Sequence, residues 1–314
     1  MRNEWKYTTE ESGLTVREVE FNSGKGGEPV KMVFMADAHF NSYNDRDLED
    51  PVLASTVQYR LWNAGGSSVP NLIRCLEYAK SINADAACIA GDVPDFFSSG
   101  CLDLIKENIW DKYPDTIIAL GNHDTAKCIQ GKIPDTTPVP EKLEVLQKYW
   151  NHDISYYSKK LGDKAIVIQM DNSSYYDFGH KGFFESQIPK LEADIETARA
   201  EGRLVFIFYH TPMSTENEDC TFCDASMVGD KKNTRINFYD IGIGSRKDEV
   251  TTRVYNLIRN NSDVVAACIA GHVHSDFYTE IKAKKSSGED DVIPQYVIMG
   301  TPYNKGHVLK ITVN

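Results

Sequence analysis

The chain has 314 residues, of which 41% are hydrophobic and 25% are charged, so it can bury a sizeable core and is not wholly disordered. Asp and Glu outnumber Lys and Arg by 46 to 34, which gives a formal charge of -12. This acidic balance argues against a protein that binds nucleic acid by general electrostatic attraction.

The chain shows no signal for membrane insertion or export. Its apolar runs fall short of the roughly 18 residues that a membrane span requires. Residues 1–12 lack the apolar core of an export signal, and the seven cysteines are an odd number spread thinly along the chain. These features predict a cytoplasmic protein with reduced thiols and no membrane span. Length alone allows one domain or two, at about 150 residues each.

Apolar runs typical of strands alternate with stretches typical of helices. An alternating pattern at 14–21 predicts an edge strand or one arm of a hairpin. Further strands are expected at 32–36, 86–90, 116–120, 165–170, 204–209, 264–270, 295–299 and 307–313. Helices are expected at about 70–82, 102–111, 141–150, 186–201 and 249–260. We expect Ser186 to cap the fourth helix and Gly202 to end it. The alternation predicts a layered α/β fold.

Three stretches interrupt this alternation, at about 41–68, 125–140 and 212–247. They are rich in Asp, Gly, Asn, Pro and Lys, and loops of this length inside a compact domain are often functional. We expect them to shape a substrate cleft. Cys220 and Cys223 lie in the third stretch, where a solvated loop is favoured over a zinc or redox site because no second such pair exists.

His, Asp and Asn side chains follow five of the apolar strands directly. The five places hold Asp37 and His39; Asp92 and Asp95; Asn122, His123 and Asp124; His210; and His272 and His274. Ligands of α/β sheets bind at the carboxyl ends of strands, so these places predict one shared crevice. Two of the pairs, Asp37 with His39 and His272 with His274, are spaced i, i+2. In an extended chain this spacing turns both side chains of a pair to the same side. Gly91, Gly121 and Gly271 permit sharp turns and close backbone approach.

Seven of these side chains are candidate metal ligands, and they indicate a centre with two ions. Imidazole nitrogens with carboxylate or amide oxygens, and no thiolate, suit Mn, Fe, Zn or Co. One catalytic ion uses about four to six donors, so seven donors with one shared carboxylate fit two ions. Two ions ~3.5–4 Å apart can clamp the attacking and leaving oxygens of an in-line displacement and acidify a bridging water. The seven are Asp37, His39, Asp92, Asn122, His210, His272 and His274.

The five places resemble the ordered signature of the calcineurin-like metallophosphoesterases, which is D-x-H, G-D-x-x-D, G-N-H-D/E, an isolated H, and G-H-x-H. Here they read ADAHF, GDVPD, GNHD, YHTP and GHVH, and they span residues 37–274. The resemblance implies a four-layer α/β/β/α sandwich with two central mixed sheets and the metal site at the strand ends. Because it covers most of the chain, we expect a single domain over 1–314 that carries the three insertions.

The resemblance also implies a role for each site residue. Asp37, His39 and His274 would bind one metal ion, Asn122, His210 and His272 the other, and Asp92 would bridge both. His123 would protonate the leaving-group oxygen or stabilise the developing charge, and Asp95 would orient its ring. The cofactors would be two divalent or trivalent transition-metal ions, Mn, Fe or Zn, and a bridging hydroxide would attack phosphorus in line.

Departures from the signature narrow the branch within the family. Phe96 and Phe97 follow Asp95 where phosphoprotein phosphatases have Arg-Gly, and Asp95 stands where purple acid phosphatases carry a metal-binding Tyr. The cyclic-nucleotide phosphodiesterase and bacterial phosphohydrolase branches are more similar. We therefore expect a hydrolase of a small phosphodiester or nucleotide-type compound. The alternatives are a phosphomonoesterase or a non-catalytic scaffold on the same fold; a nuclease is disfavoured by the acidic charge. The sequence does not specify the oligomeric state.

Overall fold

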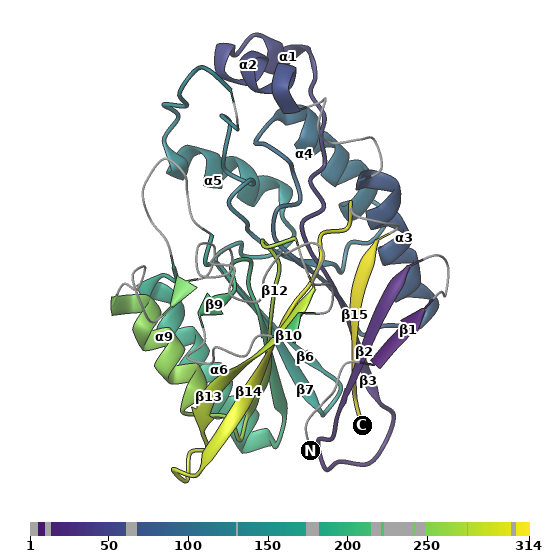
Figure 1. Cartoon of the computed structure of the whole chain (residues 1–314), viewed down its shortest axis with the longest axis vertical. Helices are drawn as coiled ribbons and strands as arrows, with labels where there is room; N and C mark the ends of the chain where they lie inside the picture. Colours follow the sequence, from purple (N-terminus) through teal and green to yellow (C-terminus); the bar gives the residue numbers. More distant parts are fainter. Residues whose placement is uncertain are drawn as a thin grey trace.

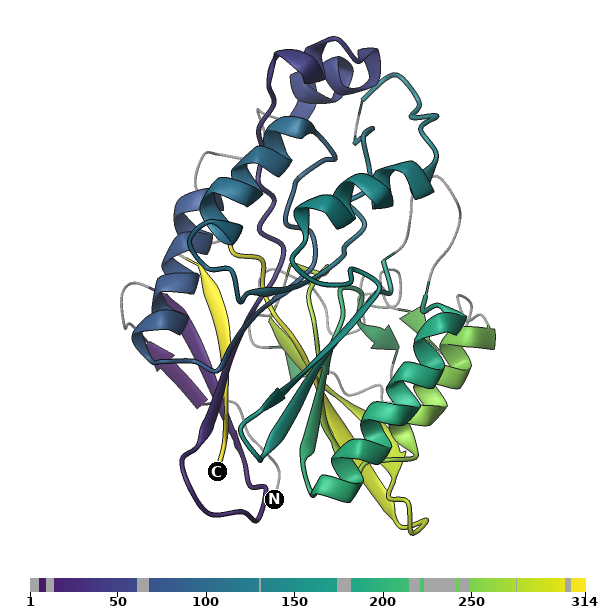
Figure 2. The same cartoon turned by 180° about the vertical axis from the view of Figure 1, so that it is seen from behind.

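Two β-sheets lie face to face in the computed structural model, and helices cover the outer face of each (Figures 1 and 2). The expected four-layer α/β/β/α sandwich is confirmed. The structure describes residues 6–9, 14–60, 68–129, 131–173, 182–214, 221–222, 241–242, 249–274, 276–302 and 306–314. Among these residues, no helix combines the length and the apolar character that crossing a bilayer demands.

The first sheet has six strands in the order β1-β2-β15-β3-β4-β5. They are β1 (Lys6–Thr9), β2 (Thr15–Phe21), β15 (His307–Val313), β3 (Val30–Met35), β4 (Ala86–Ala90) and β5 (Ile117–Ala119). β3, β4 and β5 are parallel, so their carboxyl ends meet at one edge. β15 runs antiparallel to β3 and parallel to β2. β2 pairs antiparallel with β1, as a hairpin arm does, but it lies inside the sheet and not at its edge.

The second sheet has seven strands in the order β10-β13-β14-β12-β8-β7-β6. They are β10 (Thr221–Phe222), β13 (Phe277–Lys284), β14 (Asp290–Val297), β12 (Val265–Ala270), β8 (Leu204–Phe208), β7 (Ala165–Met170) and β6 (Tyr156–Leu161). The four central strands β7, β8, β12 and β14 are parallel, while β6 and β13 are antiparallel to their neighbours. β9 (Met213–Ser214) and β11 (Ile241–Gly242) form a separate short parallel pair.

Each sheet is covered by helices with one apolar face. α3 (Ser68–Ser81), α4 (Ser99–Ile105) with the π-helical turn η1 (Lys106–Trp110), and α5 (Val139–Tyr149) lie on the six-stranded sheet. α6 (Ile188–Glu201), with the 3-10 turn η2 (Glu185–Gln187), and α9 (Glu249–Arg259) lie on the seven-stranded sheet. In α3 the apolar face arises because buried residues recur at helical spacing, at Leu72, Cys75, Leu76 and Ala79.

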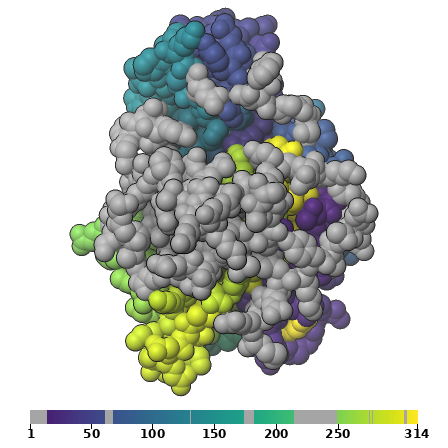
Figure 3. Space-filling model, viewed as in Figure 1, coloured from purple at the N-terminus to yellow at the C-terminus, as the bar shows by residue number. Residues whose placement is uncertain are grey.

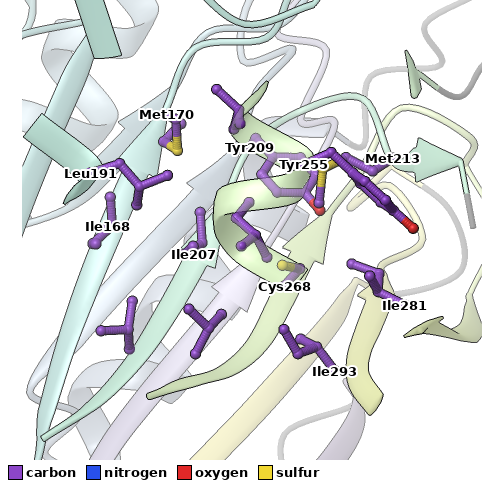
Figure 4. Packing of buried hydrophobic residues seen from close by; sticks show 14 of the residues in the cluster. Ile168, Met170, Leu191, Ile207, Tyr209, Met213, Tyr255, Cys268, Ile281 and Ile293 are labelled. Carbon is purple, nitrogen blue, oxygen red and sulfur yellow. The ribbon is translucent and has the colours of Figure 1, made fainter. Parts of the chain in front are cut away.

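Three layers of buried side chains hold the sandwich together. The middle layer joins the two sheets, as where the rings of Phe34 and Phe208 meet edge to face at 5.7 Å. Figure 4 shows the layer between the seven-stranded sheet and its helices, where Leu191 of α6 faces Ile168 and Ile207. Because the central strands are covered on both faces, their sequences are continuously apolar.

The expected strands and helices are observed, with ends shifted by a few residues. β6 and β13 were not expected; they are polar, partly exposed strands that lack a continuous apolar run. The expected cap Ser186 is wrong, since this residue lies inside η2 and α6 begins after Gln187 without a side-chain cap. Gly202 does end α6, in a left-handed conformation with φ 61°.

The irregular stretch expected at 41–68 is also corrected by the structure. It contains α1 (Asp45–Leu48) and α2 (Pro51–Arg60). The Asn and Asp residues that suggested a loop are caps: Asn44 and Asp47 form a capping box at the start of α1. Figures 1 and 3 show α1, α2 and the residues 125–129 and 131–138 together at the upper end of the molecule. Most of 212–247, with Cys220 and Cys223, falls outside the described residues.

Candidate metal centre

The seven candidate ligands meet where strands of both sheets end. From the six-stranded sheet, Asp37 and His39 follow β3, Asp92 follows β4 and Asn122 follows β5. From the seven-stranded sheet, His210 follows β8, and His272 and His274 follow β12. Since the two sheets are packed face to face with these edges together, side chains far apart in sequence become neighbours.

Asp37, His39 and His274 form the first cluster. The Nε2 atoms of the two histidines lie 2.9 Å apart. Asp37 Oδ1 lies 3.3 Å from His274 Nε2 and 4.0 Å from His39 Nε2. One ligand atom from each residue could therefore face a common ion. This is the set that the family signature assigns to one metal ion.

Asp92, Asn122, His210 and His272 form the second cluster. His210 Nε2 lies 3.2 Å from Asp92 Oδ2, 3.1 Å from Asn122 Oδ1 and 3.0 Å from His272 Nδ1. Asp92 Oδ2 also lies 4.0 Å from His39 Nε2 of the first cluster. The carboxylate of Asp92 is thus placed between the clusters, where a bridging ligand would stand.

The protonation states of four candidate ligands, Asp37, His39, Asp92 and His272, suit metal binding. Burial lowers the pKa of His272 to about 3, with help from the nearby charge of His210, and burial also lowers the pKa of His39. Burial alone would raise the pKa of Asp37 and Asp92, but neighbouring histidines outweigh it and hold both carboxyls below their usual range. Neutral imidazoles and ionised carboxylates are the forms that bind transition metals.

The centre also favours a positive charge. Burial would lower the pKa of His210, yet Asp92 and then Asp37 raise it to about 9. The buried carboxylates thus draw a proton onto the nearest ring, which is how a buried anionic site balances its charge. Transition-metal cations would supply that balance, and the residues present therefore fit such ions.

The candidate ligands have unusual backbone conformations. Among the described residues other than glycine, six have positive φ angles, and five of these are candidate ligands: Asp37 (51°), His39 (47°), Asp92 (52°), His272 (69°) and His274 (53°). Left-handed backbone costs such residues of order 1 kcal/mol or more each and is concentrated at functional sites. The expectation that both i, i+2 pairs converge through extended backbone is therefore wrong: each pair lies in a left-handed turn beyond its strand.

Glycines next to the ligands allow the close backbone approach that the sequence predicts. A Cβ on Gly271 would lie 2.5 Å from Asp37 Oδ2. A Cβ on Gly121 would collide with the carboxylate and the backbone nitrogen of Asp92. Gly91 combines φ +82° with an approach to the ring of His210. Any larger residue at these three positions would displace a candidate ligand.

His123 and Asp95, the expected general acid and its orienting partner, lie together beside the first cluster. His123 Nδ1 lies 2.6 Å from the backbone carbonyl of Asp95 and 3.6 Å from its Oδ1. The ring of His123 meets that of His39 edge to face at 4.6 Å. Because Nδ1 is occupied by Asp95, Nε2 is the ring nitrogen left for proton transfer. Burial would lower the pKa of His123, but Asp92 and Asp95 raise it above the usual value.

Two further aspartates lie beside the centre: Asp124, which belongs to the GNHD motif but has no role predicted from the sequence, and Asp276, which belongs to no motif. Asp124, the last residue of GNHD, accepts hydrogen bonds from the backbone nitrogens of Asp92 (2.9 Å) and Gly121 (2.7 Å). Asp276, two residues beyond His274, is buried against Arg17 at 2.7 Å and His307 at 3.0 Å. Asp124 thus fixes the turn that carries Asp92, and Asp276 anchors the chain just before β13 to Arg17 of β2 and His307 of β15.

Phe96 and Tyr59 have ordinary packing environments. Phe96 is fully buried and packs with Leu53 and Val57 of α2. Tyr59 is partly exposed, with the Lys132 ammonium 5.6 Å from the centre of its ring. His152, which fits no metal motif, accepts a hydrogen bond from the backbone nitrogen of Ile118. Trp62 and His180 lie outside the described residues.

Comparisons with known proteins identify the family. A family model described as calcineurin-like phosphoesterase matches residues 30–276. A comparison with curated proteins found no match. Solved structures with a similar fold include a dimetal phosphatase from Danio rerio, with 14% identity and a TM-score of 0.49, covering 87% of this chain and 88% of that one.

Two other solved structures are similar at lower scores. The calcineurin-like phosphoesterase YfkN from Bacillus subtilis is 14% identical with a TM-score of 0.39, and the match covers 87% of this chain and 82% of that one. The purple acid phosphatase PPD1 from yellow lupin is 11% identical with a TM-score of 0.45, and the match covers 94% of this chain and 46% of that one. Since the family model covers well over half of the sequence, the chain belongs to the calcineurin-like phosphoesterases and is a phosphoester hydrolase.

Proposed function

We propose that this hydrolase works with two transition-metal ions, Mn, Fe or Zn, and that its substrate is a small phosphodiester or nucleotide-type compound. The observation that carries the proposal is the meeting of seven donor side chains, from both sheets, in two clusters on either side of the Asp92 carboxylate. A cytoplasmic location and a single domain over 1–314 are parts of the same proposal.

The donor set divides between the two ions. Asp37, His39 and His274 would hold one ion, and Asn122, His210 and His272 the other. Asp92 would contact both. When bound, the ions would polarise the phosphoryl oxygens and lower the pKa of the attacking water.

His123 would act on the leaving group. Its Nδ1 is held by Asp95, which leaves Nε2 to donate a proton to the departing oxygen. The raised pKa of His123 favours the protonated form that a general acid needs near neutral pH. Phe96, the residue after Asp95, is buried and offers no charge for gripping a phosphate, which supports a diester over a monoester.

Elemental analysis and two chromogenic esters test this proposal. The protein is purified without chelator, its bound metals are measured, and the same sample is assayed with and without added Mn²⁺ on p-nitrophenyl mono- and diesters. We expect about two equivalents of transition metal per chain and a higher rate on the diester. A higher rate on the monoester would select the phosphomonoesterase alternative. Folded protein that binds neither metal nor ester would select the scaffold alternative.

Substitution of the general acid provides the first prediction. His123→Ala should lower turnover by ~10²–10⁴ on an ester with a poor leaving group, because general acid catalysis contributes about that much. Metal content should not change, since His123 is outside both ligand sets. Asp92→Asn is the contrasting variant, in which metal content and activity should fall together while the circular dichroism spectrum is retained. Wild-type turnover in His123→Ala would remove the assignment.

A further inference from the structure

Arg60 ends α2, in the stretch that the sequence suggested was a loop, and its side chain reaches Asp95. Arg60 Nε donates to Asp95 Oδ2 at 2.8 Å, and a terminal guanidinium nitrogen contacts Asp95 Oδ1. The side chain of Asp95 is 0% exposed and that of Arg60 is 16% exposed. Two shielded contacts of one guanidinium with one carboxylate fix both the distance and the angle between the groups.

Asp95 in turn connects Arg60 to the two histidines. The same Oδ1 atom lies 3.2 Å from His39 Nδ1 and 3.6 Å from His123 Nδ1. If this carboxylate rotated, His39, a candidate metal ligand, and His123, the candidate general acid, would both lose the same partner atom. Asn41 adds a brace, since its Nδ2 donates to Asp95 Oδ2 at 2.8 Å and to the backbone carbonyl of Arg60 at 3.0 Å.

α2 is fixed against the segment that follows His123. Thr56 Oγ1 donates to the carbonyl of Lys127 at 2.8 Å, and the Lys127 ammonium lies 3.0 Å from Asp50. The backbone nitrogen of Lys132 donates to Ser55 Oγ at 2.8 Å. Apolar side chains of α2 also pack with those around the site, in a cluster of Leu53, Val57, Phe96, Cys101, Ala126 and Ile129. The guanidinium of Arg60 is thus held by an element that cannot shift independently of His123.

We propose that Arg60 is a positioning residue that holds the Asp95 carboxylate in the orientation shared by His39 and His123. This inference rests on the proposed function, because it assigns Arg60 an effect on proton donation to the leaving group. Arg60 acts through Asp95 and not on the reacting atoms. Without it, Asp95 can rotate, and the ring of His123 loses its fixed alignment. The effect should be largest for poor leaving groups, which depend most on proton donation.

A leaving-group series tests this dependence. Wild type, Arg60→Ala and Arg60→Lys are loaded with Zn²⁺ and assayed on aryl phosphate diesters, from 2,4-dinitrophenyl to phenyl. We expect Arg60→Ala to lower kcat about 10–100-fold on the phenyl ester and less than about 3-fold on the dinitrophenyl ester, with metal content unchanged. Arg60→Lys should give a partial loss, because an ammonium cannot make two parallel contacts. A matched control is Arg46→Ala, which removes an exposed arginine of α1 paired with Asp103 and should not alter any rate.

A second measurement does not depend on catalysis. Long-range ¹H–¹⁵N spectra of the Zn²⁺-loaded protein report which ring nitrogen of each histidine carries a proton. We expect wild type to show a proton held on Nδ1 of both His39 and His123, whether or not Nε2 of His123 also carries one. Arg60→Ala should show shifted or averaged signals for both rings. Arg46→Ala should match wild type.

Three results would overturn the inference. They are unchanged ring signals in Arg60→Ala, an equal loss of rate across all leaving groups, and a loss of rate accompanied by loss of metal. If wild type hydrolyses none of the esters, the proposed function fails, and the ring signals alone then decide whether Arg60 positions the two histidines.

Discussion

A side chain that points back toward the end of its strand within two residues requires a sharp backbone turn. In this protein the candidate ligands themselves occupy these turns. Asp37, His39, His272 and His274 all have positive φ. Glycine would make such turns without strain, but glycine offers no ligand atom. The strain is therefore placed on the residues that carry the chemistry, while glycine occupies the adjacent positions where a Cβ would collide.

Gly121→Ala tests this division of roles. The added Cβ would collide with the carboxylate and backbone nitrogen of Asp92, so the carboxylate between the two clusters must move. We predict that metal content falls by about half or more and that ester hydrolysis falls ~10²-fold or more, as when a ligand is misplaced by about 1 Å. Elemental analysis and the ester assay measure both. Gly26→Ala is the matched control, since nothing lies within 4 Å of its added Cβ. Full metal content in Gly121→Ala would contradict the prediction.

At this scale the sequence shows ligand identity but not ligand geometry. Residue types and spacing predict which side chains gather, because each place follows an apolar strand. The left-handed turns could not be predicted, since i, i+2 spacing reads equally as extended chain. Arg60 and Asn41 carry no motif either. Arg60 reaches Asp95 only because α2 folds, and that helix was not expected. Asn41 reaches Asp95 because it follows Phe40, whose carbonyl accepts a hydrogen bond from the backbone nitrogen of Asp95.

Among the elements, the buried strands were predictable and the polar ones were not. β4 and β7 begin and end at the expected residues, because strands covered on both faces are almost wholly apolar. β15 also matches, although its Lys310 and Thr312 are partly exposed. β6 reads YYSKKL and has only its first and last residues fully buried. α1 is capped by Asn44 and Asp47, and Asn and Asp are also the residue types that are common in loops. A sequence pattern therefore does not distinguish a short capped helix from a loop.

One contact between elements should respond to pH. His152, in the connection after α5, accepts a hydrogen bond from the backbone nitrogen of Ile118 in β5 at 3.0 Å, and its ring packs by Tyr157 of β6. Burial lowers the pKa of His152 below its usual value. The folded state therefore favours the neutral ring, while the unfolded chain takes up a proton near pH ~6.5. Its stabilisation is fully present above pH ~6.5 and is lost as the pH falls toward the folded-state pKa, by at most about 1.4 kcal/mol per pH unit.

Urea denaturation of wild type and His152→Gln between pH 8 and pH 5 measures this effect. Glutamine keeps an acceptor atom but does not titrate in this range. We expect the difference in unfolding free energy between the two proteins to shrink as the pH falls below ~6.5. Comparing the two proteins at equal metal concentration cancels the titration of the metal centre, which is common to both. A difference that stays constant with pH would show that His152 does not contribute to the pH dependence.

In the whole molecule, the candidate centre joins two sheets that are packed through an apolar layer and linked by polar contacts such as that of Asp276 with Arg17. Four candidate ligands come from the six-stranded sheet and three from the seven-stranded sheet, and they meet at one edge. The family resemblance made this architecture predictable, because the parallel strands direct their carboxyl ends to the same side. The placement of 41–60 beside 125–129 and 131–138 at the upper end was not predictable, since it depends on side-chain contacts such as that of Thr56 with Lys127.

This cross-linking leads to a prediction about stability. Ions that bind only the folded chain stabilise it by about 2.7 kcal/mol when present at roughly 100 times their dissociation constant. Removing the ions also leaves Asp37 and Asp92 buried at 0% and 2% exposure without that compensation. We therefore expect a chelator to lower the unfolding free energy by about 3 kcal/mol, measured by urea denaturation with and without it.

Hydrogen exchange should increase together at the ends of β3, β4, β8 and β12, because the ligands after these strands share the same ions. Asp92→Asn should bind the ions weakly and respond little to chelator, which separates loss of the centre from a direct effect of the chelator. If the ions are removed and the urea midpoint stays the same, they lie outside this centre and do not connect the sheets.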